Sequence, residues 1–192
     1  MTIVIDGNIG AGKTTQLGHL EKLGYSVKRE PVSDWPLEKF YRNPSSTCFM
    51  FQIAVLYSNL KKREYQVYER GILPGRMVFW EDLLLRGVVK STEEHFWYDK
   101  LFEELKWYPD KYIFLDIKPE TSFKRISKRT QAGDNSIDMN LLQSLNNRYK
   151  YMIERIREKC EVHIIDGELP EEEILRQIKK IIQVPSSTVE YK

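Results

Sequence analysis

A glycine-rich stretch near the start of the chain has the residue types and spacing of a phosphate-binding loop. Residues 7–14 read Gly-Asn-Ile-Gly-Ala-Gly-Lys-Thr, which fits G-x-x-x-x-G-K-[ST] without a gap. Glycines let backbone N–H groups converge on a phosphate at a helix N-terminus, the lysine adds a cation, and the threonine hydroxyl is a ligand for Mg²⁺. A chance match in a chain of this length has a probability under about 1%. The stretch therefore predicts binding of a nucleoside triphosphate, and we expect ATP with Mg²⁺.

Carboxylates and an arginine follow two of the predicted strands. Glu30 is predicted to end the second strand, and Glu69 ends the third, directly before Arg70. A carboxylate at such a strand end can accept a proton from an alcohol or hold Mg²⁺, although an isolated one is more often a solvated acid. Phosphoryl transfer needs an in-line acceptor, a metal and positive charge, which Lys13 and Arg70 supply. The combination favours transfer of a phosphoryl group to a hydroxyl.

A basic segment in the second half of the chain is predicted to form a lid. Lys124, Arg125, Lys128 and Arg129 fall in one predicted helix, with Arg125 and Arg129 on the same face. Such a run is usually a solvated helix face. Residues 131–136, however, contain Gly, Asp and Asn and no apolar residue larger than alanine, as a mobile loop does. A helix that leads into such a loop is a common construction for a closing lid, here over about residues 125–136.

The elements that must position these residues alternate along the chain. Apolar runs predict strands over residues 2–6, 26–30, 66–69, 112–117 and 162–165. Helical spacing predicts helices over residues 17–23, 47–62, 77–85, 93–105, 119–129, 141–156 and 170–182. The alternation predicts an α/β fold with an open parallel sheet of five strands flanked by helices. Ligands bind such sheets at the carboxyl ends of the strands, where the acids lie.

Length, charge and hydropathy restrict the class of protein. A chain of 192 residues predicts one domain, over residues 1–184, with a tail at 185–192. The net charge of +2, with acids and bases interspersed, argues against nucleic-acid binding by a strong positive field. No apolar stretch approaches ~20 residues, so no membrane span is expected. No targeting segment is recognised, and Cys48 and Cys160 fit no metal spacing, so we expect a cytoplasmic protein with reduced thiols.

Taken together, these motifs resemble the deoxynucleoside kinase family. The resemblance is carried by the P-loop, by the element Glu-Pro-Val-x-x-Trp at residues 30–35, by Glu69-Arg70 and by the basic lid. It covers about residues 2–182, and the Glu-Pro-Val-x-x-Trp element is its specific part. The family includes enzymes similar to thymidine kinase 2, enzymes similar to deoxycytidine and deoxyguanosine kinase, and insect multisubstrate enzymes. The resemblance implies a P-loop kinase fold with a short lid and ATP-dependent phosphorylation of a deoxynucleoside 5′-hydroxyl in nucleotide salvage.

The resemblance also assigns roles to individual residues. Glu30 would be the general base, assisted by Lys13, Arg70 and Arg129, and Thr14 and Glu69 would hold Mg²⁺. The ATP site would contain Gly7, Asn8, Ile9, Gly10, Ala11, Gly12, Lys13, Thr14, Thr15, Arg125, Arg129 and Asp166. The nucleoside site would contain Glu30, Trp35, Tyr41, Phe51, Gln52, Val55, Arg70, Gly75, Phe79 and Asp134. Family members are usually homodimers packed through helices, which makes residues 47–62 a candidate interface.

Two of these assignments depend on spacing within the family pattern. The sugar-binding tyrosine lies eleven residues before the glutamine that reads the base, which is the separation of Tyr41 and Gln52. Without the resemblance, Gln52 is as easily a surface residue. An aromatic residue ten positions after the strand-end glutamate stacks on the base, and Phe79 is so placed.

The chain departs from the family pattern in three places. Gly71 stands where a serine is usual. In the lid, Gln131 stands where the family has its second arginine, and Asp134 is the residue nearest to the position of the family's sugar-binding acid. Asn59 and Gly75 stand where deoxycytidine-preferring members have an arginine and an aspartate. The last departure favours a pyrimidine, and thymidine in particular, as the acceptor base.

Two other functions fit part of the sequence. The stretch Gly-Ala-Gly-Lys-Thr-Thr-Gln at residues 10–16 also resembles thymidylate kinase. A monophosphate acceptor is already negative, so a carboxylate base such as Glu30 suits a nucleoside better. A nucleotide-dependent switch without turnover is the second alternative. The chain contains no Asn-Lys-x-Asp segment for reading guanine, and it keeps both Lys13 and the predicted base.

Overall fold

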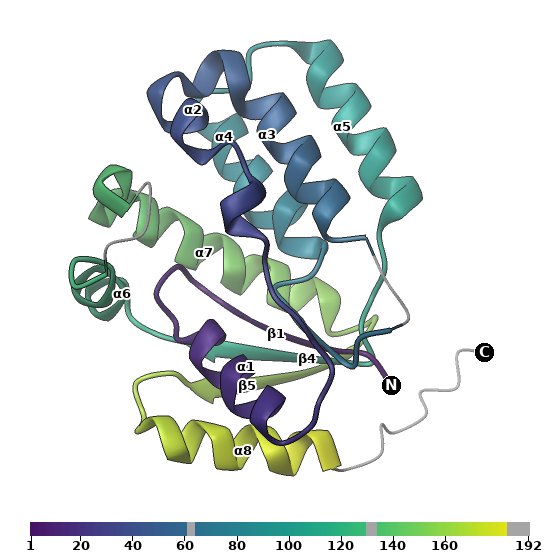
Figure 1. The fold of residues 1–192 in the computed structure, drawn as a ribbon. Coiled ribbons are helices and arrows are strands. Elements are labelled where there is room, and N and C mark those ends of the chain that lie inside the picture. Colours follow the sequence, from purple (N-terminus) through teal and green to yellow (C-terminus); the bar gives the residue numbers. More distant parts are fainter. Residues whose placement is uncertain (61–63, 130–133, 184–192) are drawn as a thin grey trace.

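The computed structural model describes residues 1–60, 64–129 and 134–183 (Figure 1). Within these residues five parallel strands form one sheet with the order β2-β3-β1-β4-β5. The strands are β1 (Ile3–Gly7), β2 (Val27–Lys28), β3 (Val67–Glu69), β4 (Lys111–Asp116) and β5 (Glu161–Asp166). The predicted α/β fold with a parallel five-stranded sheet is confirmed.

Helices cover both faces of the sheet. They are α1 (Lys13–Lys22), α2 (Leu37–Arg42), α3 (Pro44–Ser58), α4 (Glu81–Leu85), α5 (Thr92–Leu105), α6 (Pro119–Ile126), α7 (Met139–Ile156) and α8 (Glu171–Gln183). Short turns of other helical types lie at η1 (Val32–Asp34), η2 (Gly75–Trp80) and η3 (Asp134–Ser136). Figure 1 shows α1 and α8 below the sheet and α7 above it, with α2 to α5 forming a further layer. No helix of the described residues is long and apolar enough to cross a membrane.

The central strand β1 divides the core because its side chains alternate between the two faces. Ile3 and Ile5 pack in a cluster with Leu17 of α1 and Ile178 of α8. Val4 packs in the opposite cluster, which takes in residues of α3, α5 and α7. Asp6 follows Val4 on the α7 side and is fully buried. A carboxylate therefore enters the core directly before the P-loop.

The first half of the chain differs from the prediction at three points. Strand β2 stops at Lys28, so Glu30 lies in the connection after it rather than at its last residue. The short helix α2 was not predicted; Pro36 directly precedes its first turn, where proline is well tolerated. The helix predicted over 47–62 begins earlier, at Pro44, where proline is tolerated in the same way. It is described to Ser58, and residues 61 and 62 lie outside the described residues.

Two further helices also differ from their predicted form. The helix predicted over 77–85 is a π-helical stretch, η2, that continues into α4. The helix predicted over 119–129 ends at Ile126, so Arg129 lies beyond α6. The sequence had predicted that Arg125 and Arg129 share one helix face, and this prediction is wrong because Arg129 lies outside the helix. The part of the predicted lid at residues 130–133, including Gln131, lies outside the described residues.

Candidate active site

The P-loop connects β1 to α1 at the carboxyl end of the sheet. Gly7 and Gly10 both have positive φ, at 157° and 81°. A Cβ on Gly7 would lie 2.6 Å from the Leu115 carbonyl oxygen, and one on Gly10 would lie 3.1 Å from that of Ser122. Only glycine fits such backbone conformations and such close neighbours. Because α1 starts at Lys13, the loop wraps the N-terminus of this helix, where backbone N–H groups and the helix dipole favour an anion.

Lys13 is buried inside the loop. Its Nζ donates to the carbonyl oxygens of Gly7 and Asn8, each at 3.1 Å. Burial, followed by the charge of Arg70, lowers the pKa of Lys13 to about 8. A phosphate in the loop would supply the opposite charge that a buried ammonium group needs.

Thr14 and Glu69 meet at the edge of the loop. The Thr14 hydroxyl donates to Glu69 Oε1 at 2.7 Å, and Glu69 Oε2 accepts from the Glu30 backbone N–H at 3.2 Å. Hydroxyl and carboxylate oxygens are the donors that Mg²⁺ prefers. In the described part of the chain, no cluster of three His, Cys, Asp or Glu residues is arranged to hold a metal. The pair fits a Mg²⁺ ion that takes its remaining ligands from phosphate and water, as this ion usually does.

Glu30 and Arg70 form a buried ion pair beside this edge. Arg70 Nε donates to Glu30 Oε1 at 2.7 Å, and each side chain is only 8% exposed. Burial raises the pKa of Glu30, while the charges of Arg70 and Lys13 act to lower it. A carboxylate with a raised pKa is a stronger proton acceptor, as general-base catalysis requires. The Arg70 guanidinium also lies over the Phe79 ring, 4.8 Å from its centroid.

The backbone at Arg70 is in an unusual conformation. Its φ of 66° is the only positive value among the non-glycine residues of the described ranges. A residue in this conformation costs of order 1–3 kcal/mol and persists where its surroundings hold it. The next residue, Gly71, has φ 70°, and a Cβ there would lie 3.0 Å from Val4 Cγ2. This packing accounts for glycine at the position where the family usually has serine.

Aromatic side chains gather near Gln52 on α3. Phe51 stacks on Phe40, with ring centroids 4.4 Å apart, and meets Trp35 edge-on at 6.2 Å. Trp35 Nε1 donates to the Ser58 hydroxyl at 3.2 Å. Gln52 is 2% exposed, so it is not a surface residue. Its Oε1 has no hydrogen-bond partner among the described residues, which is the state expected of an amide that waits for a ligand.

The positions that set base choice in the family resemblance have different surroundings. Asn59 Nδ2 donates to the Val55 carbonyl at 2.9 Å, so the Asn59 amide is held by its own helix. Gly75 is buried, and among the described residues outside its own helical turn a Cβ built there would meet the Tyr98 hydroxyl oxygen, at 3.5 Å. That hydroxyl is also buried without a hydrogen-bond partner within the described ranges. The absence of a side chain at Gly75 therefore leaves the Tyr98 hydroxyl uncovered on this side by about the size of one methyl group.

The described ends of the predicted lid come together near Tyr41. Arg129 makes a bidentate ion pair with Asp134, at 2.7 and 2.9 Å. Burial raises the pKa of the Tyr41 hydroxyl, and the charges of Asp134 and Arg129 act on it in opposite directions. The fold thus brings the predicted sugar-binding residues, Tyr41 and Asp134, into one neighbourhood from distant parts of the chain. Arg129, which was predicted to act on the phosphoryl group, is therefore paired with Asp134.

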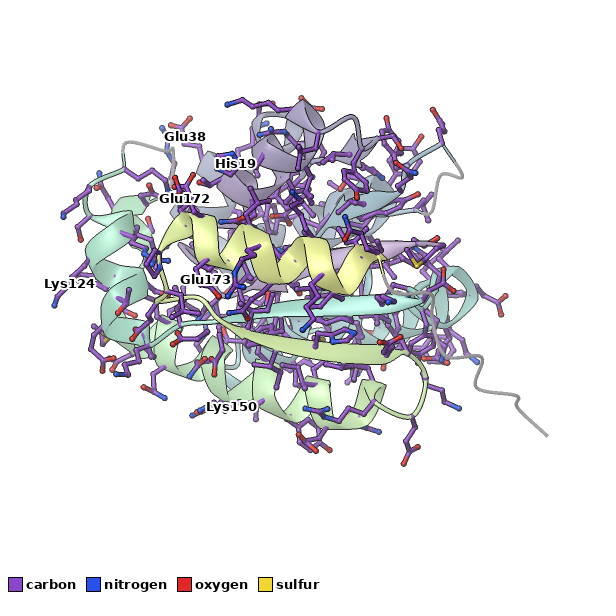
Figure 2. All side chains as sticks on the ribbon, turned by 90° about the horizontal axis from the view of Figure 1, so that it is seen from below. His19, Glu38, Lys124, Lys150, Glu172 and Glu173 are labelled. Carbon is purple, nitrogen blue, oxygen red and sulfur yellow. The ribbon has the colours of Figure 1, made fainter. Side chains whose placement is uncertain are left out.

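Arg125 joins the P-loop to the loop after β5. It donates to the carbonyl oxygens of Gly10 and Gly167, at 3.4 and 3.0 Å. Asp166 stands at this loop but is exposed, and its Oδ1 accepts from the Glu168 backbone N–H at 2.9 Å. Lys124 projects outward from α6 (Figure 2). Of the basic residues on α6, Arg125 is therefore the one placed at the P-loop.

Sequence reasoning missed three buried residues behind Arg70. The hydroxyl groups of Tyr112 and Tyr149 both donate to the Asp6 carboxylate, and Asp6 and Tyr149 also contact the Arg70 guanidinium. The available signal was the acid that interrupts the apolar run of β1 directly before Gly7. Tyr112 belongs to the apolar run of β4 and Tyr149 lies at a buried position of the amphipathic helix α7, so both are indistinguishable from ordinary core residues in the sequence.

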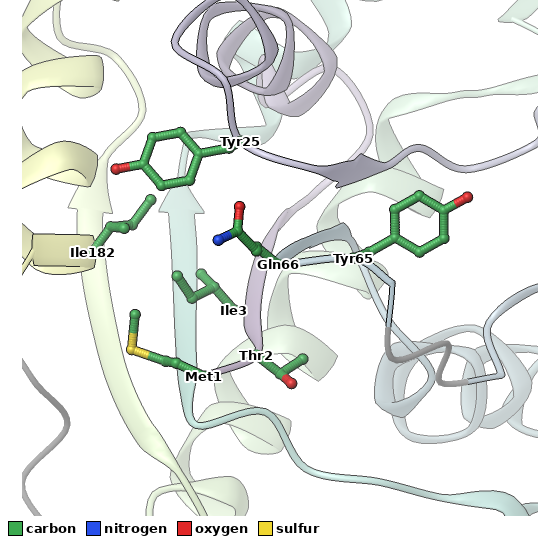
Figure 3. Close-up of a pocket in the computed structure, with 7 residues that line it drawn as sticks. All are labelled: Met1, Thr2, Ile3, Tyr25, Tyr65, Gln66 and Ile182. Atoms are coloured by element: carbon green, nitrogen blue, oxygen red, sulfur yellow. The ribbon is translucent and has the colours of Figure 1, made fainter.

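A separate cavity lies at the opposite edge of the sheet (Figure 3). It measures about 400 Å³ and is lined by residues at the amino ends of the strands, such as Ile3 and Gln66, and by Tyr25, Tyr65 and Ile182. The described residues of its lining carry no charged side chain, and the α-amino group of Met1 is paired with Asp110 at 3.9 Å. A phosphate site needs cations or converging N–H groups, so the chemistry points to the P-loop edge rather than to this cavity.

Known proteins similar to this chain bear on its activity. The family model described as "Deoxynucleoside kinase" matches residues 3–187. A protein of Invertebrate iridescent virus 6 that is named as a kinase is 30% identical over 95% of this chain and 97% of its own length. Deoxyadenosine kinase of Dictyostelium discoideum is 30% identical over 80% of this chain and 67% of its own length.

A solved structure agrees with these sequence matches. The structure of deoxyadenosine kinase from M. mycoides with bound dCTP has a TM-score of 0.84 and 25% sequence identity. The match covers 95% of this chain and 98% of that one. The chain therefore belongs to the deoxynucleoside kinase family.

Proposed function

We propose that the chain transfers the γ-phosphoryl group of ATP to the 5′-hydroxyl of a deoxynucleoside. Membership of the family supports nucleoside phosphorylation in general. The observation that carries the proposal is the buried Glu30–Arg70 pair, which lies beside the Thr14–Glu69 pair at the end of the P-loop. A carboxylate base, a cation and a metal-binding edge are the parts that transfer to an alcohol requires.

Each part has a chemical task in this proposal. Glu30 accepts the proton of the 5′-hydroxyl as the oxygen attacks phosphorus. Lys13 and Arg70 offset the negative charge of the transferred group, and Arg129 joins them if Asp134 releases it when the sugar binds. Thr14 and Glu69 would hold Mg²⁺, which when bound neutralises charge on the donor phosphates. A carboxylate base beside the acceptor suits a neutral nucleoside better than a monophosphate, so we place thymidylate kinase activity second.

The donor site runs from the P-loop to the loop after β5. The backbone of residues 7–15 would bind the phosphates, with Lys13 moving from its carbonyl partners to the phosphate oxygens. Arg125 bridges the two loops and presents its planar group beside Asp166 and Gly167, where we place the adenine. No other cation on α6 would be needed there.

Thymidine is the acceptor that we propose first. The Gln52 amide, whose Oε1 lacks a partner among the described residues, can exchange hydrogen bonds with the edge of a pyrimidine, and the Phe51 and Phe79 rings would lie against its faces. Deoxyadenosine is the second candidate because similar proteins bear the name deoxyadenosine kinase. Its larger base would extend toward Gly75, which has no side chain to oppose it, and toward the Tyr98 hydroxyl, which lacks a hydrogen-bond partner among the described residues.

We further propose that the enzyme is a homodimer. Helices α3 and α5 lie side by side (Figure 1) and expose large apolar side chains. On α5 these are Phe96, Trp97, Leu101 and Leu105, and on α3 they are Met50 and Tyr57. The spacing of Trp97, Leu101 and Leu105 puts them on one stripe, and a contiguous exposed apolar patch is typical of a protein interface. The apolar surface extends the predicted α3 interface to α5.

A substrate profile tests the proposed reaction. ADP release is followed with ATP, Mg²⁺ and each of thymidine, deoxycytidine, deoxyadenosine and deoxyguanosine, with thymidylate as a fifth acceptor. We expect turnover with a nucleoside and a higher kcat/KM for thymidine than for thymidylate. Turnover with thymidylate alone would replace the proposal by a monophosphate kinase. No turnover with any acceptor would refute it.

A further inference from the structure

A buried carboxylate lies between the P-loop and Arg70. Asp6 is fully buried, and its Oδ1 accepts from the Gly7 backbone N–H at 2.7 Å. The same oxygen accepts from the Tyr149 hydroxyl at 3.2 Å and lies 3.4 Å from Arg70 Nη1. The other oxygen, Oδ2, accepts from the Tyr112 hydroxyl. One carboxylate oxygen thus contacts both the first residue of the P-loop and the guanidinium.

The Arg70 guanidinium is held from several sides at once. Nη1 also donates to the Tyr149 hydroxyl, which comes from α7, while Nε donates to Glu30. The Phe79 ring closes the face of the group. Because the Arg70 backbone is in a left-handed conformation, these side-chain contacts must hold the residue in place.

The presence of an acid at this position calls for a reason. Taking a carboxylate out of water is costly, and an apolar side chain in the strand would pack without that penalty. Burial indeed raises the pKa of Asp6, and Arg70 and Lys13 counteract the rise. A costly group that is kept in the core, beside groups proposed for the reaction, is better explained by function than by stability.

We infer that Asp6 is a positioning residue for phosphoryl transfer, which fixes the start of the P-loop and the Arg70 guanidinium in one arrangement. The donor phosphate bound by the loop and the acceptor hydroxyl beside Arg70 then meet in line. Tyr149 completes the arrangement because it contacts both Asp6 and Arg70. The inference rests on the proposed function, in which Arg70 acts at the transferred group.

Two tyrosines form a matched pair for the test. Tyr149→Phe and Tyr112→Phe each remove one buried hydroxyl that donates to Asp6, but within the described residues only the Tyr149 hydroxyl also accepts from Arg70. We expect Tyr149→Phe to lower kcat by about 10- to 100-fold, as a displaced reacting group does, with both KM values changed by less than about threefold. Tyr112→Phe should leave kcat within about threefold of the parent, since the Oδ1 contacts remain.

Asp6→Asn supplies an independent variant of nearly equal size without the charge. It should lower kcat in the same way, and combining it with Tyr149→Phe should add little, because both changes act on the same guanidinium. Thermal unfolding checks that each variant is folded, and if Asp6→Asn does not fold, the two tyrosine variants decide alone.

Four outcomes would contradict the inference. Equal losses of kcat in the two tyrosine variants, or losses that lie in KM, would show that Asp6 only supports the core. An unchanged kcat in Tyr149→Phe would show that Arg70 needs no such support. A parent enzyme that phosphorylates no nucleoside would refute the proposed function itself, and Arg70 would then have no reaction to be positioned for.

Discussion

Arg70 donates from Nε to the Glu30 carboxylate at 2.7 Å. This ion pair joins the segment after β2 to the first residue after β3, which are 40 residues apart in the sequence. Both side chains are almost fully buried, so neither charge has water as an alternative partner. The pair ties the proposed base to the proposed phosphoryl-binding cation before any substrate arrives. The ionised state of Glu30 is balanced between burial, which raises its pKa, and Arg70, which lowers it.

The first prediction concerns the base. Glu30→Gln keeps the shape of the side chain and a hydrogen-bond acceptor for Arg70 but removes the proton acceptor. We expect kcat to fall by about 10²- to 10⁴-fold, the usual contribution of a general base, while nucleoside affinity stays nearly intact. Turnover assays combined with calorimetric nucleoside binding measure both quantities. A variant that keeps its kcat would show that Glu30 is not the base.

The second prediction concerns the pH dependence of ATP binding. Because burial and Arg70 lower the pKa of Lys13 to about 8, the free protein loses this cation as the pH rises through that value. From that pKa, Lys13 is about 90% protonated at pH 7 and about 10% at pH 9. ATP binds the protonated form, so its affinity should fall by up to about tenfold over this range, with proton uptake at the higher pH.

Lys13→Arg provides the control for this effect, since arginine stays protonated throughout. Calorimetry in two buffers of different ionisation enthalpy measures affinity and proton uptake together. An ATP affinity that is equally flat in the parent protein and in Lys13→Arg would contradict the lowered pKa.

The P-loop, the sheet and Glu69 could be predicted from the sequence because their signals are local. The spacing of Gly7, Gly12 and Lys13 defines the loop by itself, and an apolar run of suitable length defines each strand. The end of β3 fell at Glu69, as predicted. The class of fold then follows from the alternation of strands and helices.

The features that the sequence did not reveal depend on contacts between distant segments. Glu30 lies beyond β2, and Arg70, not strand geometry, fixes its carboxylate. Arg129 lies beyond α6 and pairs with Asp134, whereas the helical spacing of the sequence had placed it within the helix. The role of Asp6 becomes visible only when α7 brings Tyr149 over β1.

The third prediction concerns Gln52, whose buried Oε1 lacks a partner within the described ranges. Gln52→Met keeps the length of the side chain and removes the polar group. We expect kcat/KM for the preferred nucleoside to fall by about 10-fold, mainly through KM, for the loss of one or two hydrogen bonds. Stability should be unchanged or higher, because an unsatisfied buried group is removed.

A fall in kcat/KM without a fall in stability would distinguish a binding role of Gln52 from a structural one. Gln143→Met is the matched control, since Gln143 is an exposed glutamine on α7 whose amide donates to Asn147. It should change neither quantity. A loss of stability in Gln52→Met without a change in KM would make Gln52 a structural residue.

The fourth prediction concerns the apolar surface of α3 and α5. Trp97 and Leu101 are 59% and 39% exposed in one chain, and burying such side chains against a second copy is favourable by roughly 25 cal/mol per Å². We therefore expect the protein to sediment at twice the 22.8 kDa of one chain. Leu101→Glu places a charge in the buried stripe and should give the monomer, without unfolding the chain, because the side chain faces outward.

Tyr151→Glu is the matched control: Tyr151 is 62% exposed on α7, away from this surface, and its substitution should leave the dimer intact. Sedimentation of the parent as a monomer, or equal dissociation by both substitutions, would refute the proposed interface.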